Sequence, residues 1–347
     1  SRAKVIAVTG SVGKTSTKEM LRTVLAGQGR VHAAEASFNN HWGVPVTLAR
    51  LPAETDFAVV EIGMNHPGEI APLARLARPH VAMITTVAPA HLEAFDSLEG
   101  IAREKAAIFD ALEPGGIAVI PSGLAVTPIL AEAAAARAAR TLRFGTDPGD
   151  DYRILDVTIA QDATIVRAAR HGAPLLFKVQ TAGRHFAANA LGVLAVAEAV
   201  GADPAVAACD IGQWCPPAGR GRRERIYMDI VDDAKYFDLI DDAFNANPAS
   251  MEAALDLLGA TEPRDGIGRI RSGRRIAVLG DMLELGPTEA ELHRAIAGHP
   301  AMARIHLVHC VGPTMRALWD RLPQARRGEW HETAAELAAR AHQIADA

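Results

Sequence analysis

The sequence predicts an α/β fold in two domains, on three observations. Short apolar runs of strand length alternate with longer segments of helical period, which is the pattern of β-α units around a buried parallel sheet. The first apolar run leads directly into a glycine-rich turn. The chain has 347 residues, of which 49% are apolar, so it can bury more than one core. We expect a mostly parallel sheet in a larger first domain and a smaller α/β domain after it.

The first domain is expected over residues 1–214. Apolar runs predict strands at 5–8, 57–60, 81–84 and 117–120, and helical spacing predicts helices at 15–26, 68–77, 98–112 and 123–139. Between 152 and 181, short alternating stretches around His171 and Gly172 predict antiparallel strands at a sheet edge. A helix from about Arg184 to Val200 closes this domain.

A pair of prolines flanked by glycines, in GQWCPPAGRG, marks the boundary to a second domain over residues 215–347. The alternation of strands and helices then resumes. The predicted strands are near 226–231, 236–241, 275–280 and 304–311, and the predicted helices are near 248–259, 288–298, 313–321 and 332–345. We expect a smaller, Rossmann-like α/β domain.

Composition and charge exclude several classes of protein. The net charge is −5 and long Lys/Arg runs are lacking, so neither nucleic acid nor an anionic membrane is expected as a partner. No apolar stretch reaches the roughly 18–20 residues of a membrane span, and the first residues lack a signal-peptide pattern, which predicts a cytoplasmic protein. The three cysteines are predicted to be buried thiols, and the single basic cluster is interpreted as a solvated turn. These residues are Cys209, Cys215 and Cys310, and Arg220, Arg222, Arg223 and Arg225.

The segment KVIAVTGSVGKTST, residues 4–17, predicts a phosphate-binding loop between a strand and a helix. Glycines let the backbone turn so that its N–H groups face phosphate oxygens. Lys14 would reach the outer phosphates, and Thr15 would offer its hydroxyl to Mg²⁺. The loop is a variant, because Val8 stands where a glycine is usual, and a turn that binds nothing is the alternative. The predicted nucleotide-binding residues here are Gly10, Ser11, Val12, Gly13, Lys14, Thr15 and Ser16.

Two further residues are expected at the same edge of the sheet. Glu61 ends an apolar strand, and ligands of open α/β sheets bind at the carboxyl edge, so Glu61 is placed to hold Mg²⁺ directly or through water. His91 follows the next strand in a loop. A solvent-facing Glu and a structural His are the alternatives. Lys105, judged by helical periodicity alone, is an exposed charge.

Two polar sets occur later in the chain. His185 and Asn189 lie one helical turn apart near a helix start, where they could read a planar base or cap the helix. Asp241 and Asp242 end a strand of the second domain, where carboxylates suit ribose hydroxyls or a metal.

A set of segments, in this order and at this spacing, resembles the Mur ligase family. The segments are TGSVGKTST, NNHWGVPVTL, EIGMNHPGEI, APAHLEAF, the helix around Lys105, GRHFAANA, PPAGRGR, DDAFNANPASM and GDMLELG. The resemblance covers essentially the whole chain. It implies a chain that lacks the family's N-terminal uridine-diphosphate-binding domain and its extreme C-terminus. The chain departs from the family at Pro121-Ser122, where Asn-x-Asp is often found, and at Phe186, which leaves Asn189 as the asparagine of its motif.

The resemblance implies an ATP-dependent amide ligase of peptidoglycan precursor synthesis. D-alanyl-D-alanine would be joined to the UDP-N-acetylmuramoyl-tripeptide through an acyl phosphate, with ATP and two Mg²⁺ ions, by a monomeric enzyme. Lys14 would bind the β- and γ-phosphates. Thr15 and Glu61 would hold the first Mg²⁺, and His91 the second. The remaining implied roles are a carbamate on Lys105 that supports the second ion, and contacts of Asn189 with adenine, Arg220 with phosphates and Asp242 with ribose.

Two other functions compete with this interpretation. One is another acid:amino-acid ligase on the same scaffold, similar to a folylpolyglutamate synthase, which NANPASM and GDMLELG disfavour. The other is a nucleotide-binding scaffold that has lost its chemistry. The presence together of Lys14, Glu61, His91 and Lys105 disfavours it.

Overall fold

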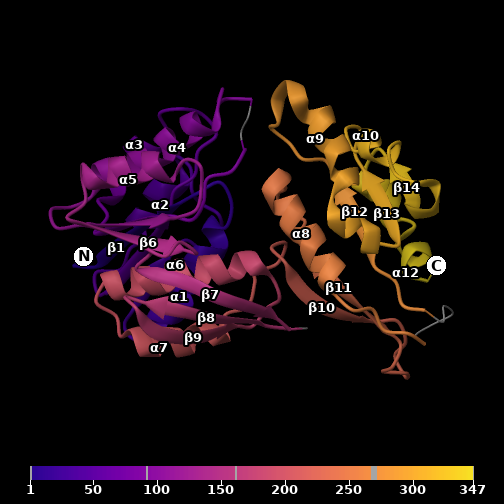
Figure 1. Ribbon diagram of the computed structural model, residues 1–347, viewed down its shortest axis with the longest axis horizontal. Helices are drawn as coiled ribbons and strands as arrows, with labels where there is room; N and C mark the ends of the chain where they lie inside the picture. Colours follow the sequence, from indigo (N-terminus) through magenta and orange to yellow (C-terminus); the bar gives the residue numbers. More distant parts are fainter. Residues whose placement is uncertain (1, 91–92, 161, 267–271, 347) are drawn as a thin grey trace. The chain divides into compact units, whose positions relative to one another are not determined.

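The computed structural model describes residues 2–90, 93–160, 162–266 and 272–346. The chain divides into two compact units, Ser1–Cys215 and Pro216–Ala347. Figure 1 colours the first unit from indigo to pink and the second from orange to yellow. Among the described residues, no helix is both long and apolar enough to cross a membrane.

A nine-stranded sheet forms the centre of the first unit, in the order β2-β3-β1-β4-β5-β6-β7-β8-β9. Strands β1 to β7 pair in parallel, whereas β8 is antiparallel to both of its neighbours. The strands are β1 (Lys4–Thr9), β2 (Val31–Ala33), β3 (Phe57–Glu61), β4 (Val81–Ile84), β5 (Ile117–Pro121), β6 (Arg140–Gly145), β7 (Tyr152–Ile159), β8 (Thr164–Arg170) and β9 (Ala173–Val179). The prediction of an α/β fold with a mostly parallel sheet is confirmed.

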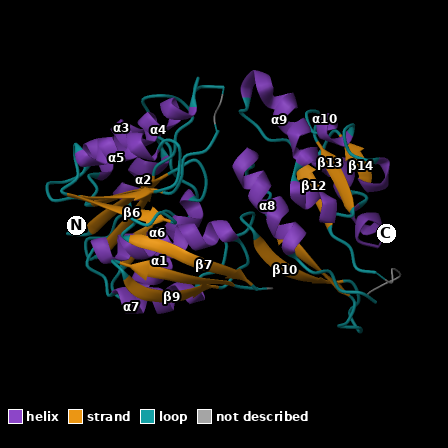
Figure 2. Ribbon diagram, viewed as in Figure 1, coloured by secondary structure: helices purple, strands orange, loops and turns teal. Residues whose placement is uncertain are grey.

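Helices cover both faces of this sheet (Figure 2), and each face has its own apolar core. Residues of β1 alternate between the cores, because Ile6 and Val8 face one side and Ala7 the other. One core includes residues of α1 (Lys14–Ala26), α6 (Arg184–Ala199) and α7 (Pro204–Asp210). The opposite core includes residues of α2 (Gly43–Ala49), α3 (Ile70–Ala77), α4 (Leu98–Ala106) and α5 (Thr127–Ala135).

The predicted elements of this unit are present, including the antiparallel strands after residue 152. Four elements were not predicted, namely β2, α2, β6 and α7. Helix α5 ends at Ala135 rather than near 139, and β6 begins at Arg140. Arginines interrupt the apolar pattern of β6, and its burial alternates along the strand, so its sequence lacks a continuous apolar run.

The second unit contains two small sheets and its own core. An antiparallel pair joins β10 (Arg222–Tyr227) to β11 (Tyr236–Asp241), and a parallel sheet has the order β12-β13-β14. The other elements are β12 (Ile276–Gly280), β13 (Leu307–Val311), β14 (Arg327–His331), α8 (Pro248–Ala260), α9 (Glu289–Ala295), α10 (Arg316–Trp319), α11 (Ala334–Ala338) and α12 (Ala341–Asp346). The core lies between α8 and the parallel sheet and includes Met251, Leu255, Leu279 and Val308.

Three further expectations, two for the second unit and one for the cysteines, were wrong. The basic cluster is not a solvated turn, because β10 contains Arg222, Arg223 and Arg225, and the Arg223 guanidinium lies 2.7 Å from the Asp238 carboxylate on β11. The predicted helices at 288–298, 313–321 and 332–345 are shorter or divided, and β14 was missed because RGEWH has no apolar run. Only one of the three cysteines is buried: Cys310 is buried, and Cys209 and Cys215 are exposed.

Candidate functional site

The glycine-rich loop joins β1 to the first residue of α1, Lys14. The N-cap residue of α1 is Gly13, whose φ of 83° is in the left-handed region that favours glycine. A glycine has no side chain with which to cap the helix, so the N–H groups of the first turn face the loop. Thr15 and Ser16 follow with only 6% of each residue exposed. The turn has the geometry of an anion site at a helix N-terminus.

The segment after β4 is hydrogen-bonded to this loop. The Ser11 N–H donates to the Thr86 carbonyl at 2.9 Å, and the Ser11 hydroxyl donates to the Ala88 carbonyl at 2.9 Å. The Thr85 hydroxyl donates to the Val12 carbonyl at 2.6 Å. A Cβ on Gly10 would lie 1.8 Å from that hydroxyl oxygen, so a larger residue at position 10 would disrupt the hydrogen bond between Thr85 and Val12. The loop is therefore preformed.

Lys14 folds back over the loop that precedes it. Its ammonium donates to the Gly10 carbonyl at 2.8 Å, four residues earlier in the chain. The ammonium is thus at the loop itself, where the phosphates were predicted.

Glu61 lies at the end of β3, and in the sheet it is the register partner of Val8 on β1. The residue is 1% exposed. Its Oε1 accepts hydrogen bonds from the Thr15 hydroxyl at 3.1 Å and from the Asn39 amide at 2.8 Å. Its Oε2 is buried and has no hydrogen-bond partner among the described residues. A buried carboxylate oxygen without a donor is suited to a cation, so the solvent-facing alternative is wrong.

Sequence reasoning assigned no role to the loop before α2, which completes this constellation. The Ser37 hydroxyl lies 3.1 Å from that of Thr15, and Asn39 bonds Glu61. A Cβ on Gly63 would come within 2.8 Å of the Asn39 side chain, so the backbone after β3 lies against this amide. The signal in the sequence was the polar pair Asn39-Asn40 shortly before a helix, but it does not reveal which strand end the loop approaches.

Lys105 is buried, in contrast to the expectation from periodicity. The residue is 1% exposed on α4. Burial holds the pKa of its ammonium well below the usual value, and the positive charge of Lys14 lowers that pKa further. Periodicity failed because Ile101 and Lys105 are four residues apart and share one buried helix face.

Asn189 lies on α6 and is 8% exposed, whereas His185, one turn earlier, is exposed. The side-chain amide of Asn189 lies against the phosphate loop, because a Cβ on Gly13 would come within 2.8 Å of its Nδ2. The structure therefore brings Asn189 to the loop. His91 lies outside the described residues.

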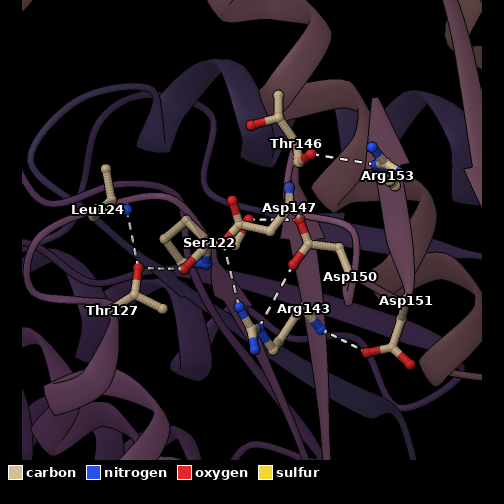
Figure 3. A network of polar contacts seen from close by, with 10 residues as sticks. Ser122, Leu124, Thr127, Arg143, Thr146, Asp147, Asp150, Asp151 and Arg153 are labelled. Atoms are coloured by element: carbon tan, nitrogen blue, oxygen red, sulfur yellow. Dashed lines mark hydrogen bonds and ion pairs between the residues drawn. The ribbon is translucent and has the colours of Figure 1, made fainter. Parts of the chain in front are cut away.

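Ser122, one of the positions at which the chain departs from the family pattern, belongs to a polar network at the ends of β5 and β6 (Figure 3). The Ser122 hydroxyl donates to Asp150 at 2.5 Å, and the Asp147 N–H donates to the same carboxylate at 2.9 Å. The Arg143 guanidinium lies 3.6 Å from the other oxygen of Asp150. Desolvation raises the pKa of this carboxyl. A later loop thus brings a carboxylate to this strand end.

The remaining predicted residues, Arg220 and Asp242, lie in the second unit. The guanidinium of Arg220 stacks over the Phe244 ring at 4.1 Å from its centroid. Desolvation raises the pKa of Asp242 to about 6, while the nearby charge of Arg220 acts in the opposite direction and that of Asp241 in the same one. Their contacts with a nucleotide stay predictions.

Within the described ranges, no group of three or more His, Cys, Asp or Glu side chains is placed to hold a metal ion. Thr15 and Glu61 instead offer a hydroxyl and one carboxylate. Mg²⁺ is usually held by one or two protein oxygens together with substrate phosphates and water, and these two residues fit that pattern.

Two family models match the chain. The Mur ligase middle domain matches residues 8–197, and the Mur ligase glutamate ligase domain matches residues 228–347. Among solved structures, MurF from Acinetobacter baumannii superposes with a TM-score of 0.86 at 28% identity, over 99% of this chain and 70% of that one. MurF from Thermotoga maritima, solved with ADP, gives a TM-score of 0.77 at 22% identity over 99% and 79%, which supports the fold alone.

Curated relatives agree with this match. The UDP-N-acetylmuramoyl-tripeptide--D-alanyl-D-alanine ligase of Bacillus subtilis is 35% identical over 84% of this chain, which spans only 59% of that relative's length. The ligase of the same name from Rickettsia prowazekii is 31% identical over 97% of this chain and 72% of its own. With its middle and glutamate ligase domains both matched, the chain belongs to the Mur ligase family.

Proposed function

We propose that this chain carries the ATP-dependent ligase activity that joins D-alanyl-D-alanine to the UDP-N-acetylmuramoyl-tripeptide. The observation that carries the proposal is the buried Glu61 carboxylate, which has one oxygen bonded to Thr15 and the other without a donor among the described residues. The substrates are those in the names of the Bacillus and Rickettsia relatives. Residues 1–214 would be the ATP-binding domain and residues 215–347 the ligase domain.

In this proposal the loop and Lys14 bind the phosphates of ATP. N–H groups at the start of α1 and the Lys14 ammonium face the phosphate oxygens, and Thr15 and Glu61 hold Mg²⁺. The ion, when bound, neutralises charge that develops on the transferring phosphoryl group. Because Thr15 donates its one proton to Glu61, its hydroxyl accepts from Ser37 with one lone pair and keeps the other lone pair for the ion.

Lys105 would act as a carbamate beside a second Mg²⁺ that His91 also holds. The lowered pKa supports this role, because only the neutral amine has a free lone pair. The Lys105 nitrogen would form a bond to the carbon of CO₂, one C–O π pair would move onto oxygen, and the nitrogen would release a proton to solvent. The buried amine would become a carboxylate, whose negative charge attracts the Lys14 ammonium instead of repelling it.

The reaction needs positioning more than covalent help from the protein. A free carboxylate of the tripeptide would attack the γ-phosphorus of ATP, and ADP would leave. The amine of D-alanyl-D-alanine would then attack the carbonyl carbon of the acyl phosphate, expel phosphate and lose a proton. This chain's residues would hold the γ-phosphate at Lys14 and keep the loop rigid through Thr85 and Ser11. Adenine and ribose would be bound by Asn189 and Asp242, and Arg220 would contact phosphate.

The test is phosphate release by the chain with MgATP, each peptide substrate alone, and both together. We expect release that requires both substrates, formation of the amide product by mass spectrometry, and loss of both signals in Lys14→Ala. Phosphate release that is independent of either substrate, or binding of ATP without product from any combination, contradicts the proposal. Product from a glutamate donor in place of D-alanyl-D-alanine would assign a different ligase of the same family.

A further inference from the structure

A second lysine of α1, Lys18, has a side chain that is 0% exposed. Its ammonium donates to the carbonyls of Ala34 at 2.6 Å and Ala36 at 3.1 Å, and lies 2.9 Å from the Glu19 carboxylate. A lysine has three N–H donors, and these three partners occupy them. A buried charge is costly unless it is paired and hydrogen-bonded. An apolar residue would fill this position at a lower desolvation cost. The contacts that the ammonium makes should therefore explain why a charged residue is present here.

The ammonium holds the start of the loop that reaches Glu61. Ala36 directly precedes Ser37, whose hydroxyl lies 3.1 Å from that of Thr15. Three residues after Ala36, the Asn39 amide donates to Glu61 Oε1 at 2.8 Å, while the Asn39 carbonyl accepts from the Gly63 N–H at 2.8 Å. The segment between the lysine contacts and the glutamate contact is therefore short.

The other end of the loop has its own anchor. The Asn40 side chain accepts hydrogen bonds from the N–H groups of Trp42 at 3.1 Å and Gly43 at 2.9 Å, which fixes the entry into α2. On the other side of the loop, Lys18 bonds the carbonyls of Ala34 and Ala36, shortly before Ser37. Loss of the Lys18 ammonium would thus release the side of the loop on which Ser37 lies, and would leave two carbonyls to find water.

We propose that Lys18 is a positioning residue for the Mg²⁺ site. It fixes the loop so that Asn39 and Ser37 orient the carboxylate of Glu61 and the hydroxyl of Thr15. This inference rests on the proposed function, in which Thr15 and Glu61 hold the ion. Partners behind metal ligands set their orientation, and their loss typically weakens metal affinity about 10-fold to 100-fold.

The experiment is a calorimetric titration of the chain with a non-hydrolysable ATP analogue over a series of Mg²⁺ concentrations, and again in EDTA. We expect Lys18→Met to weaken the apparent Mg²⁺ affinity about 10-fold or more, while the affinity for the analogue in EDTA stays within the scatter of the unmodified chain. The matched control is Arg22→Met on the same helix. Arg22 also pairs with Glu19, at 2.9 Å, but within the described part of the chain it makes no hydrogen bond to the loop, so its variant should leave both affinities unchanged.

A role in stability alone would lower the unfolding temperature and leave the Mg²⁺ dependence as it was, and that result overturns the inference. If Lys18→Met does not fold, Lys18→Arg, Asn39→Ala and their double variant decide the matter. If the losses of Mg²⁺ affinity in the two single variants are non-additive in the double variant, Lys18 acts through Asn39. Additive losses contradict the inference. If the unmodified chain shows no Mg²⁺-dependent binding that Lys14→Ala removes, the proposed function fails as well.

Discussion

The hydroxyl of Thr15 donates to the carboxylate of Glu61 at 3.1 Å, although the residues are 46 positions apart in the chain. Parallel pairing of β1 with β3 creates this relationship, because it brings the C-terminal ends of both strands to one edge of the sheet. Asn39 bonds the same carboxylate oxygen, and the other oxygen of Glu61 is buried without a hydrogen-bond partner among the described residues.

Glu61→Gln should weaken Mg²⁺-dependent nucleotide binding and spare binding without the ion. The amide keeps an oxygen that can accept from Thr15 and Asn39, but it removes the negative charge. We expect the apparent Mg²⁺ affinity to fall by at least about 10-fold, since even residues behind the ligands contribute that much. Titration with an ATP analogue at several Mg²⁺ concentrations measures this loss. Glu54→Gln, at an exposed glutamate, is the control, and an unchanged Mg²⁺ dependence in Glu61→Gln removes Glu61 from the metal site.

Gly13→Ala should impair the phosphate loop through the Asn189 contact as well as through backbone strain. Gly13 and Gly115 share a φ of 83°, but an added Cβ would meet Asn189 at 2.8 Å in the first case and nothing within 4 Å in the second. Gly115→Ala should therefore cost only the left-handed penalty of about 1–2 kcal/mol. Gly13→Ala should also lose at least about 10-fold in nucleotide affinity, about 1.4 kcal/mol.

Chemical denaturation and calorimetric titration of both glycine variants separate the two effects. Equal nucleotide affinity in Gly13→Ala and Gly115→Ala would show that Asn189 does not constrain the loop.

The strand ends of the first unit could be predicted from sequence, whereas the contacts of Glu61 could not. Apolar runs locate β1 and β3, and the parallel arrangement then places Glu61 beside the glycine loop. The partner Asn39 comes from a loop whose path depends on tertiary contacts such as the close approach to Gly63. Local patterns carry no information about such contacts.

Lys105 shows a different limit of sequence reasoning. The position was assigned to an exposed face, but its spacing from Ile101 places it on the buried stripe of α4. A charged residue on an apolar helix face was the available sign that Lys105 is buried. The periodicity argument overlooked this sign, and only the family resemblance assigned Lys105 a role in the site. The second unit was harder to predict because its strands are short and β14 is largely polar.

Lys105→Met should stabilise the chain at pH 7 in CO₂-free buffer with EDTA. Burial, followed by the charge of Lys14, lowers the folded-state pKa of Lys105, so the unfolded chain binds more protons than the folded one below the unfolded pKa of about 10.4. Stability of the unmodified chain is therefore lost as pH falls from that value toward the folded pKa. A gain of 1 kcal/mol would raise the unfolding temperature by roughly 2–4 °C.

Thermal unfolding of Lys105→Met at pH 7 and pH 10 tests this sign, with Lys178→Met, at an exposed lysine of β9, as control. The gain should shrink at the higher pH. A variant less stable than the unmodified chain at both pH values would mean that the Lys105 amine makes a favourable contact that outweighs its desolvation.

Lys105→Ala should abolish turnover while nucleotide affinity stays close to that of the unmodified chain, because the loop, Thr15 and Glu61 are intact. Short carboxylates such as acetate should restore part of the turnover by occupying the position of the carbamate. Carbon-13 NMR with labelled bicarbonate should show a carbamate signal that the variant lacks. Full turnover in Lys105→Ala would exclude the carbamate role.

The pKa of Asp242 should respond to its two charged neighbours in opposite directions. Desolvation raises this pKa to about 6. Arg220→Gln should raise the pKa further, because the guanidinium favours the ionised carboxylate, and Asp241→Asn should lower it, because a like charge is removed. Since the unfolded pKa is about 3.9, the folded state retains the proton longer, and the stability contributed by Asp242 is lost as pH rises from about 4 through 6.

Carbon-13 NMR titration of the aspartate carboxyls measures the pKa, and Asp233→Asn, at an exposed aspartate, is the control. Asp242→Asn should flatten the pH dependence of unfolding between about pH 4 and 6. If Arg220→Gln left the Asp242 titration unchanged, the paired role of Arg220 and Asp242 at a nucleotide would lose its electrostatic basis.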